Sequence, residues 1–292
     1  MQNIHRSFLA FAHDIKLSHT IFALPFAASS FVIAGLTLSS LIQILWLLLA
    51  MVGARSFAMG FNRWADRNID QLNDRTQNRQ IPAGNLSASA GLIWTALSAL
   101  VLIVSAFKLN DLSGILSLPL LAALGFYSYW KRFSYFTHWY LGFCLGLSPT
   151  AVGVALTGEF YPPLLWLGGA IMMWTAGFDI IYSLQDQEFD VKNNLKSIPS
   201  TFGPRKSIHI SRLCFITMIA ILTYVGILAS RGPLYYIGVG TIGLILTYEH
   251  YLIRGILSGL PSPKLGVAFF NMNAYVSVLY FTATIADQVL RL

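Results

Sequence analysis

The sequence predicts an all-α protein that crosses a membrane many times. Of its 292 residues, 55% are hydrophobic and only 11% carry a charge, and the mean hydropathy is +0.62. A soluble domain is closer to a quarter charged, so most of the surface is expected to face lipid. A transmembrane helix needs roughly 20 mostly apolar residues, and such stretches fill nearly the whole chain. We therefore expect residues 1–292 to form a single transmembrane domain.

Nine stretches are predicted to span the membrane. They cover residues 20–38, 41–61, 89–107, 112–130, 139–157, 163–183, 210–229, 234–252 and 266–286. Residues 1–16 are polar, aromatic and partly basic, lack the features of a signal peptide, and are expected to form a short interfacial helix. Cys144 and Cys214 lie in apolar runs with no nearby partner to complete a ligand set, which indicates buried thiols.

The basic residues gather on one side of the predicted membrane. The N-terminal segment and the connections after the second, fourth, sixth and eighth spans hold Arg6, Lys16, Arg63, Arg67, Arg75, Arg79, Lys131, Arg132, Lys192, Lys196, Arg205, Lys206, Arg212, Arg254 and Lys264. The other side holds only Lys108, Arg231 and Arg291, and Arg55 lies inside a span. The positive-inside rule predicts a multi-pass protein of the cell inner (plasma) membrane with a cytoplasmic N-terminus. The net charge of +7 reflects this bias and does not indicate a nucleic-acid partner.

The connection at residues 62–88 is long and polar, and oxygen-bearing side chains open it. Asn62, Asp66 and Asp70 are spaced four residues apart, which places them on one face of a helix. Three oxygen ligands at the end of a span suit a hard cation such as Mg²⁺. The alternative is a solvated helix end, although like charges four residues apart destabilise a helix unless something compensates.

A second acidic cluster opens the long connection at residues 184–209. Asp186 and Asp190 are again four residues apart, and Asp179 lies seven residues before Asp186, two turns deeper on the same face. A carboxylate at that depth costs about 3 kcal/mol unless it is paired or hydrated. The alternative is that Asp179 snorkels to water from a helix end. The two regions hold seven of the twelve acidic residues, which favours a shared function.

Cationic side chains accompany both clusters. They are Arg75 and Arg79 after the first, Lys192 and Lys196 after the second, and Lys131, which closes a span one turn after Tyr127. Carboxylates that hold Mg²⁺ beside Arg and Lys are typical of a pocket for a diphosphate. For each cation the alternative is a topological role at lipid headgroups.

Arg55 is the basic residue that lies well inside a predicted span. It precedes Asn62 by seven residues and so shares its helical face. An intramembrane arginine is a candidate functional residue. Arg55 would bind the carboxylate or another anionic group of a second substrate, or it would form a structural ion pair with an aspartate.

Together these motifs resemble the UbiA-type intramembrane aromatic prenyltransferases, of which 4-hydroxybenzoate polyprenyltransferase is the best-known member. The resemblance rests on Asn62/Asp66/Asp70, Asp74-Arg75-Thr76, Arg79-Gln80-Ile81-Pro82-Ala83-Gly84, Tyr127, Lys131-Arg132, Asp179, Asp186, Asp190-Val191-Lys192 and Lys196-Ser197. It implies a nine-helix bundle with a central cavity, two Asp-bearing cytoplasmic cap loops, and a lateral opening for a long isoprenoid.

The resemblance also implies roles for individual residues. The expected Mg²⁺ ligands are Asn62, Asp66, Asp70, Asp179, Asp186 and Asp190, and the expected catalytic residues are Asp66, Asp70, Asp186, Asp190 and Lys131. The resemblance implies Arg55 as the residue that orients the acceptor, and Arg75, Arg79, Tyr127 and Lys131 as the residues that hold the diphosphate. Lys192 and Lys196 are further expected substrate-binding residues because they follow the second acidic cluster. Residues 19–26 depart from the hydroxybenzoate type and are similar to a subgroup of the futalosine route to menaquinone, which leaves the acceptor open.

The expected reaction is Mg²⁺-dependent transfer of a polyprenyl group from prenyl diphosphate to an aromatic acceptor such as 4-hydroxybenzoate, in ubiquinone or menaquinone biosynthesis. The allylic C–O bond would ionise to a carbocation, and a dry aromatic pocket would protect that cation from water. The same chemistry on a naphthoate, a tocopherol precursor, haem or a glycerophosphate lipid is the nearer alternative. An ion-coupled transporter is less favoured, because the acids crowd at one interface and not at mid-membrane.

Overall fold

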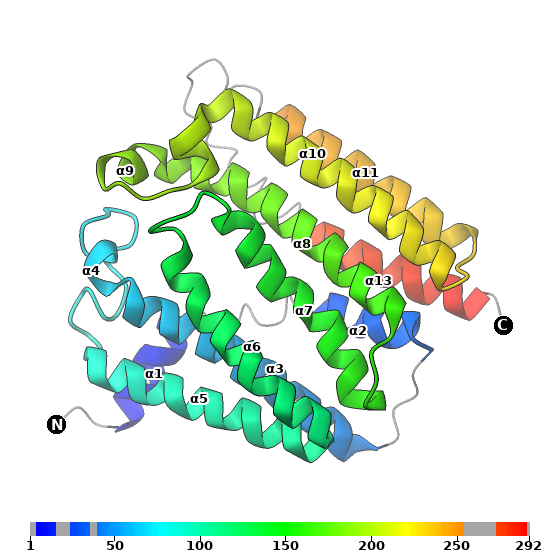
Figure 1. Ribbon diagram of the computed structural model, residues 1–292, viewed down its shortest axis with the longest axis horizontal. Helices are drawn as coiled ribbons and strands as arrows, with labels where there is room; N and C mark the ends of the chain where they lie inside the picture. The colour runs from blue at the N-terminus through cyan, green and yellow to red at the C-terminus, as the bar shows by residue number, and fades with distance from the viewer. Residues whose placement is uncertain (1–3, 16–23, 36–39, 254–272, 291–292) are drawn as a thin grey trace. The chain divides into compact units, whose positions relative to one another are not determined.

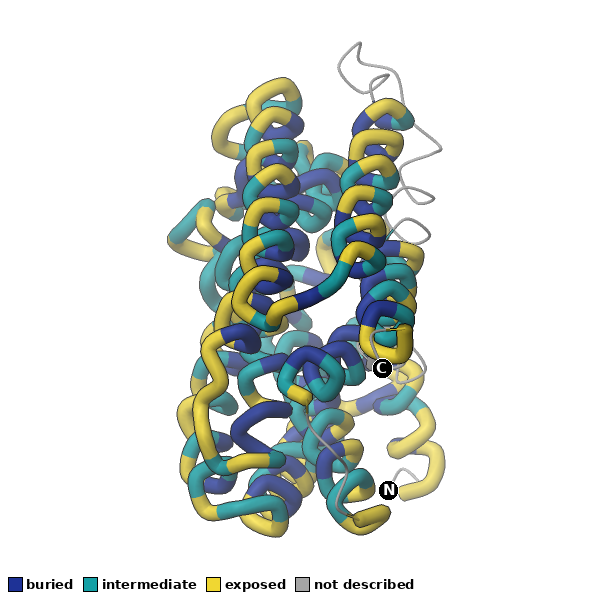
Figure 2. Tube along the Cα trace, turned by 90° about the vertical axis from the view of Figure 1, so that its right-hand side faces the viewer, coloured by how far each residue is buried: buried dark blue, intermediate teal, exposed yellow. Residues whose placement is uncertain are grey.

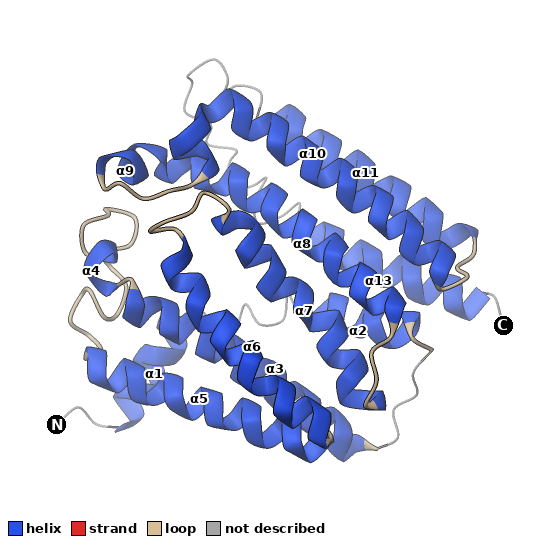
Figure 3. Ribbon diagram, in the orientation of Figure 1, coloured by secondary structure: helices blue, strands red, loops and turns tan. Residues whose placement is uncertain are grey.

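The computed structural model describes residues 4–15, 24–35, 40–253 and 273–290. The regular elements within these ranges are all helices (Figure 3). Some residues named in the sequence predictions lie outside the described residues: Lys16, residues 19–23, Arg254, Lys264 and Arg291. The chain divides into two compact units, Met1–Ile21 with Leu38–Tyr129 and Phe22–Thr37 with Trp130–Leu292, and each is described by itself.

The first unit carries the first acidic cluster. Its helices are α1 (Ile4–Asp14), α3 (Leu41–Ala65), α4 (Arg67–Asp70), α5 (Ala88–Leu109) and α6 (Asp111–Trp130). The hydroxyls of Ser40 and Ser87 begin α3 and α5 by accepting the backbone N–H three residues on. Helices α3 and α5 pack side by side (Figure 1). The predicted N-terminal helix is present as α1.

The second unit carries the second acidic cluster. Its elements are α2 (Leu24–Ile33), α7 (Thr137–Thr157), α8 (Pro162–Tyr182), the 3₁₀ helix η2 (Ser183–Asp186), α9 (Gln187–Lys192), α10 (Ile198–Leu228), α11 (Pro233–Leu252) and α13 (Asn273–Leu290). Helix α8 lies between α7 and α10 (Figure 1). Gly146 and Gly168 let α7 and α8 approach closely, because a Cβ at either glycine would overlap the other's carbonyl oxygen.

Six helices of the described residues are long and apolar enough to cross a membrane. They are α3, α5, α6, α7, α10 and the segment Pro162–Lys192 that contains α8. Buried and exposed residues alternate along the helices drawn in Figure 2. The exposed residues of the six helices include large apolar side chains such as Leu100 and Ile216. Such exposed apolar faces suit contact with lipid. Helices α2, α11 and α13 overlap three further predicted spans, so the count of nine stays a prediction.

Helix α10 begins well before its predicted span. It starts at Ile198, whereas the apolar pattern placed the start at residue 210. Ser197 caps the helix, Pro199 fits its first turn, and Gly203 (φ +77°) kinks it without ending it. The predicted loop at residues 184–209 is therefore mostly helical. Of the two cysteines, Cys214 is buried as expected, while Cys144 is partly exposed, and both are free thiols.

Candidate active site

The first acidic cluster lies where α3 ends and α4 begins. The backbone N–H of Asp66 donates to the carbonyl of Asn62 (2.9 Å), and that of Asp70 donates to the carbonyl of Asp66 (2.8 Å). The three residues therefore follow a nearly continuous helical path, as their spacing predicted. Asp66 is only 2% exposed and Asp70 only 4% exposed, so both carboxylates are buried at the helix end.

The side chains of this cluster are held by polar partners. Asn62 Nδ2 donates to Asp66 Oδ2 (3.0 Å), and Arg79 Nη1 forms an ion pair with Asp70 Oδ2 (2.6 Å). The Thr76 hydroxyl donates to the carbonyl of Asp70 (3.0 Å), which fixes the loop that carries Arg79. Asp70 and Arg79, predicted to bind metal and diphosphate respectively, are thus brought into direct contact.

Two residues that sequence reasoning did not assign to the site support this cluster. Arg63, 7% exposed, donates from Nη1 to Asn62 Oδ1 (3.0 Å) and from Nε to the carbonyl of Asp14 (3.2 Å). Asp14 Oδ1 accepts the backbone N–H of Gln80 (3.0 Å), so Asp14 links α1 to the loop after α4. Arg63 had been counted only as a topological cation, and Asp14 gave no signal because its partners lie far away in the sequence.

The remaining predicted residues of the first unit occupy three different settings. Arg55 lies in α3, about 10 Å along the helix from Asn62, and its buried Nε has no hydrogen-bond partner in the described part of the chain. Tyr127 lies partly buried in the last turn of α6. Arg75 is exposed in the loop after α4, where its backbone N–H donates to Asn73 Oδ1 (2.9 Å).

The second acidic cluster is spread over three successive elements. Asp179 lies in the last turn of α8, Asp186 ends the 3₁₀ helix η2, and Asp190 lies in α9. Because the helix type changes between them, the α-helical register that placed Asp179 and Asp186 on one face does not carry through. What organises the cluster instead is the start of α10.

Two carboxylates of this cluster, those of Asp179 and Asp190, are linked by hydrogen bonds to the start of α10. The hydroxyl of Ser197, the N-cap of α10, donates to Asp190 Oδ2 (3.0 Å). Asp179 Oδ2 contacts His138 Nδ1 (2.7 Å), and His138 Nε2 accepts the backbone N–H of Ile198 (3.2 Å). The sequence assigned no role to either residue. Ser197 was part of the motif Lys196-Ser197 that carries the resemblance, whereas His138 gave no signal beyond being a histidine at the start of an apolar run.

Two of the predicted cations are joined through the backbone. The N–H of Lys196 donates to the carbonyl of Lys131 (2.8 Å), and the neighbouring Trp130 stacks on Tyr140 with ring centroids 4.5 Å apart. The backbone of Lys131, the residue after α6, is therefore held by the segment that joins α9 to α10. Lys192 and Lys196 are exposed on that connection.

The donor set of both clusters fits Mg²⁺. All six predicted ligands offer carboxylate or amide oxygens, the ligands that this hard cation prefers. In the described ranges no three acidic, histidine or cysteine side chains converge closely enough to form a complete metal cage. Mg²⁺ seldom needs one, because it retains waters and is held by one or two carboxylates together with substrate phosphates.

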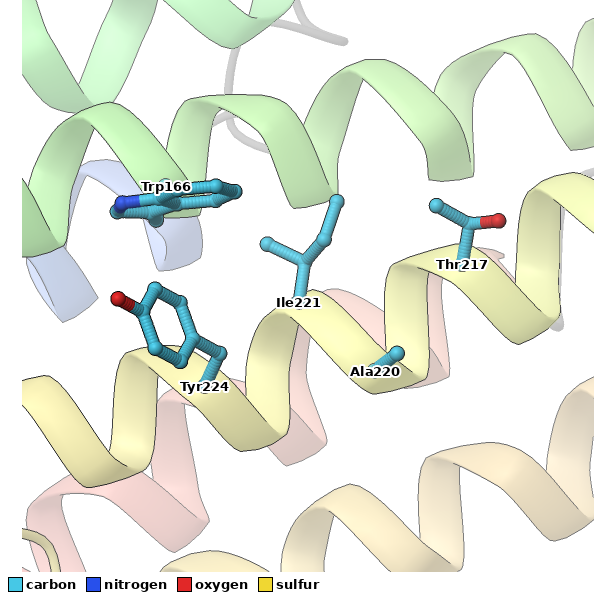
Figure 4. A pocket seen from close by; sticks show the side chains of 5 residues that line it. All are labelled: Trp166, Thr217, Ala220, Ile221 and Tyr224. Atoms are coloured by element: carbon cyan, nitrogen blue, oxygen red, sulfur yellow. The ribbon is translucent and has the colours of Figure 1, made fainter.

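Two apolar depressions lie in the second unit. One is a groove of about 350 Å³ between α8 and α10, lined by Trp166, Thr217, Ala220, Ile221 and Tyr224 (Figure 4). Trp166 precedes Asp179 by 13 residues, or about 20 Å of helix, so this groove is separate from the acidic cluster. The other, about 240 Å³, is lined by Trp130, Phe136, Trp139, Tyr140, Phe143 and Met172 near the start of α7.

The sequence matches one protein-family model and several curated enzymes. The model of the UbiA prenyltransferase family matches residues 23–279. The 4-hydroxybenzoate octaprenyltransferase of Nitrosomonas eutropha is 34% identical over 238 residues, which cover 81% of this chain and 80% of the relative. The enzyme of the same name from Dechloromonas aromatica is 30% identical over 246 residues, which cover 84% of this chain and 81% of the relative.

Solved structures share the fold. A UbiA homologue from Aeropyrum pernix K1 superposes with a TM-score of 0.82 at 27% identity, covering 93% of this chain and 98% of that one. A UbiA homologue from Archaeoglobus fulgidus, solved with DMAPP and Mg²⁺ bound, superposes with a TM-score of 0.66 at 20% identity, covering 94% of this chain and 99% of that one. This chain, an integral membrane protein, therefore belongs to the UbiA prenyltransferase family and is a prenyltransferase.

Proposed function

We propose that this prenyltransferase transfers a polyprenyl group from a prenyl diphosphate to an aromatic acceptor of the 4-hydroxybenzoate kind, in an Mg²⁺-dependent reaction of quinone biosynthesis. The observation that carries the proposal is the burial of Asp66 and Asp70, 2% and 4% exposed, with Arg79 in an ion pair with Asp70. Buried carboxylates beside a cation are groups that a metal–diphosphate complex would engage. The names of the curated relatives and the Mg²⁺ and DMAPP in the Archaeoglobus homologue support this proposal.

The donor half of the reaction is assigned to the two clusters and their cations. The proposed Mg²⁺ ligands are Asn62, Asp66, Asp70, Asp179, Asp186 and Asp190. Bound Mg²⁺ would supply Lewis-acid stabilisation of the negative charge on the leaving diphosphate. The proposed partners of the diphosphate oxygens are Arg75, Arg79, Tyr127, Lys131, Lys192 and Lys196.

Arg79 has a double role in this proposal. Before substrate binds, its guanidinium neutralises the buried carboxylate of Asp70. With Asp70 holding Mg²⁺, the guanidinium of Arg79 would be free to donate to a phosphate oxygen, for which its planar fork is well suited. Because Arg79 then meets the charge that develops on the diphosphate, the pair would favour departure of that group.

The acceptor half of the reaction is assigned to Arg55. Its buried Nε lacks a hydrogen-bond partner in the described residues, which is costly unless a ligand satisfies it. The carboxylate of an aromatic acid would accept charge-assisted hydrogen bonds from this guanidinium and would thereby be oriented. The acceptor ring carbon would then attack the allylic cation and lose a proton. The excess of basic residues on one side supports a cytoplasmic site in the inner membrane.

One experiment tests the proposal and separates its acceptor alternatives. Purified protein in detergent or liposomes is incubated with labelled octaprenyl diphosphate and with 4-hydroxybenzoate, a naphthoate, a tocopherol precursor, haem or a glycerophosphate lipid, and the products are identified by mass spectrometry. We expect a prenylated 4-hydroxybenzoate-like product that disappears with EDTA and returns with Mg²⁺. Transfer that survives chelation would contradict the metal role, and transfer only to another acceptor would reassign the substrate.

A further inference from the structure

His138 joins three helices of the second unit at the acidic cluster. It lies at the start of α7 with 1% of its surface exposed. Its Nδ1 contacts Asp179 Oδ2 on α8 (2.7 Å), and its Nε2 contacts the backbone nitrogen of Ile198 at the start of α10 (3.2 Å). Both ring nitrogens of this buried side chain are therefore engaged, one by the carboxylate of Asp179 and the other by the backbone of Ile198.

The backbone partner fixes the direction of the hydrogen bonds. The N–H of Ile198 can only donate, so His138 Nε2 must accept and carries a lone pair. The ring proton is therefore on Nδ1, where it is donated to Asp179. Two hydrogen bonds thus connect the first turn of α10, through the imidazole ring of His138, to the carboxylate of Asp179.

These two hydrogen bonds leave Asp179 able to bind a cation. His138 uses only one of the two carboxylate oxygens, and the Asp179 side chain is 23% exposed. Ligand carboxylates in metal sites are commonly oriented by such an outer hydrogen bond, and loss of the outer partner typically lowers metal affinity 10- to 100-fold. The hydroxyl of Ser197, one residue before Ile198, holds Asp190 in the same manner. The start of α10 thereby orients two carboxylates of the cluster.

We propose that His138 is a positioning residue for this prenyltransferase: with its proton fixed on Nδ1 by the Ile198 N–H, it holds Asp179 in the orientation in which Asp179 binds the divalent cation. The inference rests on the proposed function, because it takes Asp179 as a metal ligand. His138 itself touches neither the metal nor the substrate. Its side chain acts only through the carboxylate.

The test compares two replacements of His138. Glutamine keeps both roles, because its amide N–H can donate to Asp179 while its amide oxygen accepts the Ile198 N–H. Leucine keeps comparable bulk and removes both. Ser211→Ala serves as the matched control, since the buried Ser211 hydroxyl joins α10 to α8 through the backbone carbonyl of Gly177 (2.8 Å) and not through a carboxylate.

Metal binding is measured directly, without turnover, by titrating each purified protein with Mn²⁺ and recording the EPR signal of the free ion. The Mg²⁺ concentration that gives half-maximal prenyl transfer is the second readout. We expect His138→Leu to raise both the Mn²⁺ dissociation constant and the half-maximal Mg²⁺ concentration about 10- to 100-fold. His138→Gln and Ser211→Ala should stay within roughly threefold of the parent protein, and a loss of thermal stability alone should not move either value.

The outcomes separate this inference from the proposed function. If the parent protein binds no Mn²⁺, the proposed metal role fails. If the parent binds Mn²⁺ and folded His138→Leu binds it equally well, the proposed function stands and the positioning role of His138 is overturned. Equal weakening in folded His138→Gln and His138→Leu would also overturn it, because the hydrogen-bond chain would then not be what matters.

Discussion

Replacement of Arg79 by methionine is expected to destabilise the protein in the absence of Mg²⁺ and much less in its presence. The change removes the cation that contacts Asp70 Oδ2 at 2.6 Å and leaves a buried carboxylate without it. Mg²⁺ bound at Asp70 would supply positive charge in its place. The stability of this variant therefore reports on whether Asp70 is a metal ligand.

The magnitude follows from how deeply the Asp70–Arg79 pair is buried. Breaking a fully buried ion pair costs roughly 3–5 kcal/mol, whereas an exposed pair contributes about 0.2–1 kcal/mol. The Asp70 side chain is 6% exposed and that of Arg79 is 23% exposed, so the pair lies between these limits. We expect a loss of about 2 kcal/mol from the free energy of unfolding, or a fall in Tm of roughly 4 °C or more.

Thermal unfolding in detergent, with EDTA and with saturating Mg²⁺, measures this effect. Lys108→Met is the control, because it removes one positive charge from an exposed position in the last turn of α5, whereas the loop that carries the first cluster joins α5 at its first residue. We expect Lys108→Met to unfold like the parent protein and Arg79→Met to regain most of its lost stability with Mg²⁺. An Arg79→Met protein that matches the parent in EDTA, or that ignores Mg²⁺, would refute the reasoning.

Two further predictions concern the acceptor and the packing of α7 on α8. Arg55→Ala should raise the KM for the aromatic acceptor about 10- to 100-fold, the loss of one charge-assisted hydrogen bond, and should change the KM for the prenyl diphosphate far less; the reverse pattern in steady-state kinetics would reassign Arg55 to the donor. Gly146→Ala should lower the Tm, because its Cβ would overlap the Gly168 carbonyl and cost about 1–3 kcal/mol. Gly240→Ala, which adds a Cβ in open space on α11, should not lower it, and equal Tm values would argue against the close approach of the two helices.

The positions of most long helices were predictable from apolar length alone. The predicted spans 89–107 and 163–183 agree within two residues with α5 (Ala88–Leu109) and α8 (Pro162–Tyr182). An apolar run that is bounded by a cap or a proline leaves little choice of helix boundary. The start of α10 was missed for the opposite reason. Its first turns are polar and carry Gly203 and Pro204, which usually mark a loop, yet the Ser197 cap and the kink at Gly203 keep them helical.

The acidic clusters were predictable because their spacing is local, whereas the residues that orient them were not. The interval of four residues in the sequence identifies the first cluster, Asn62, Asp66 and Asp70. His138 meets Asp179 across 41 residues, and that contact exists only because the close packing of α7 on α8 brings the two together. No periodicity in the sequence records such a contact.

The same limit applies to Arg63 and Asp14. Arg63 sits beside Asn62 in the sequence, but its burial depends on Asp14, which is 49 residues away. A basic residue at the end of a span that is predicted to be cytoplasmic is already explained by the positive-inside rule, so the charge pattern gives no sign of this structural contact. The acidic clusters could therefore be found from their spacing in the sequence, whereas the residues that contact them were found only in the structure.

The two acidic clusters are proposed to hold the Mg²⁺ that activates the prenyl diphosphate. The most direct test measures prenyl transfer by folded Asp66→Asn and Asp186→Asn, each at saturating Mg²⁺, beside the exposed charge-matched controls Asp111→Asn and Glu188→Gln. We expect both site variants to lose at least about 100-fold in turnover, the equivalent of roughly 3 kcal/mol of Lewis-acid stabilisation, while the controls keep theirs. Normal turnover by folded Asp66→Asn or Asp186→Asn would contradict the claim.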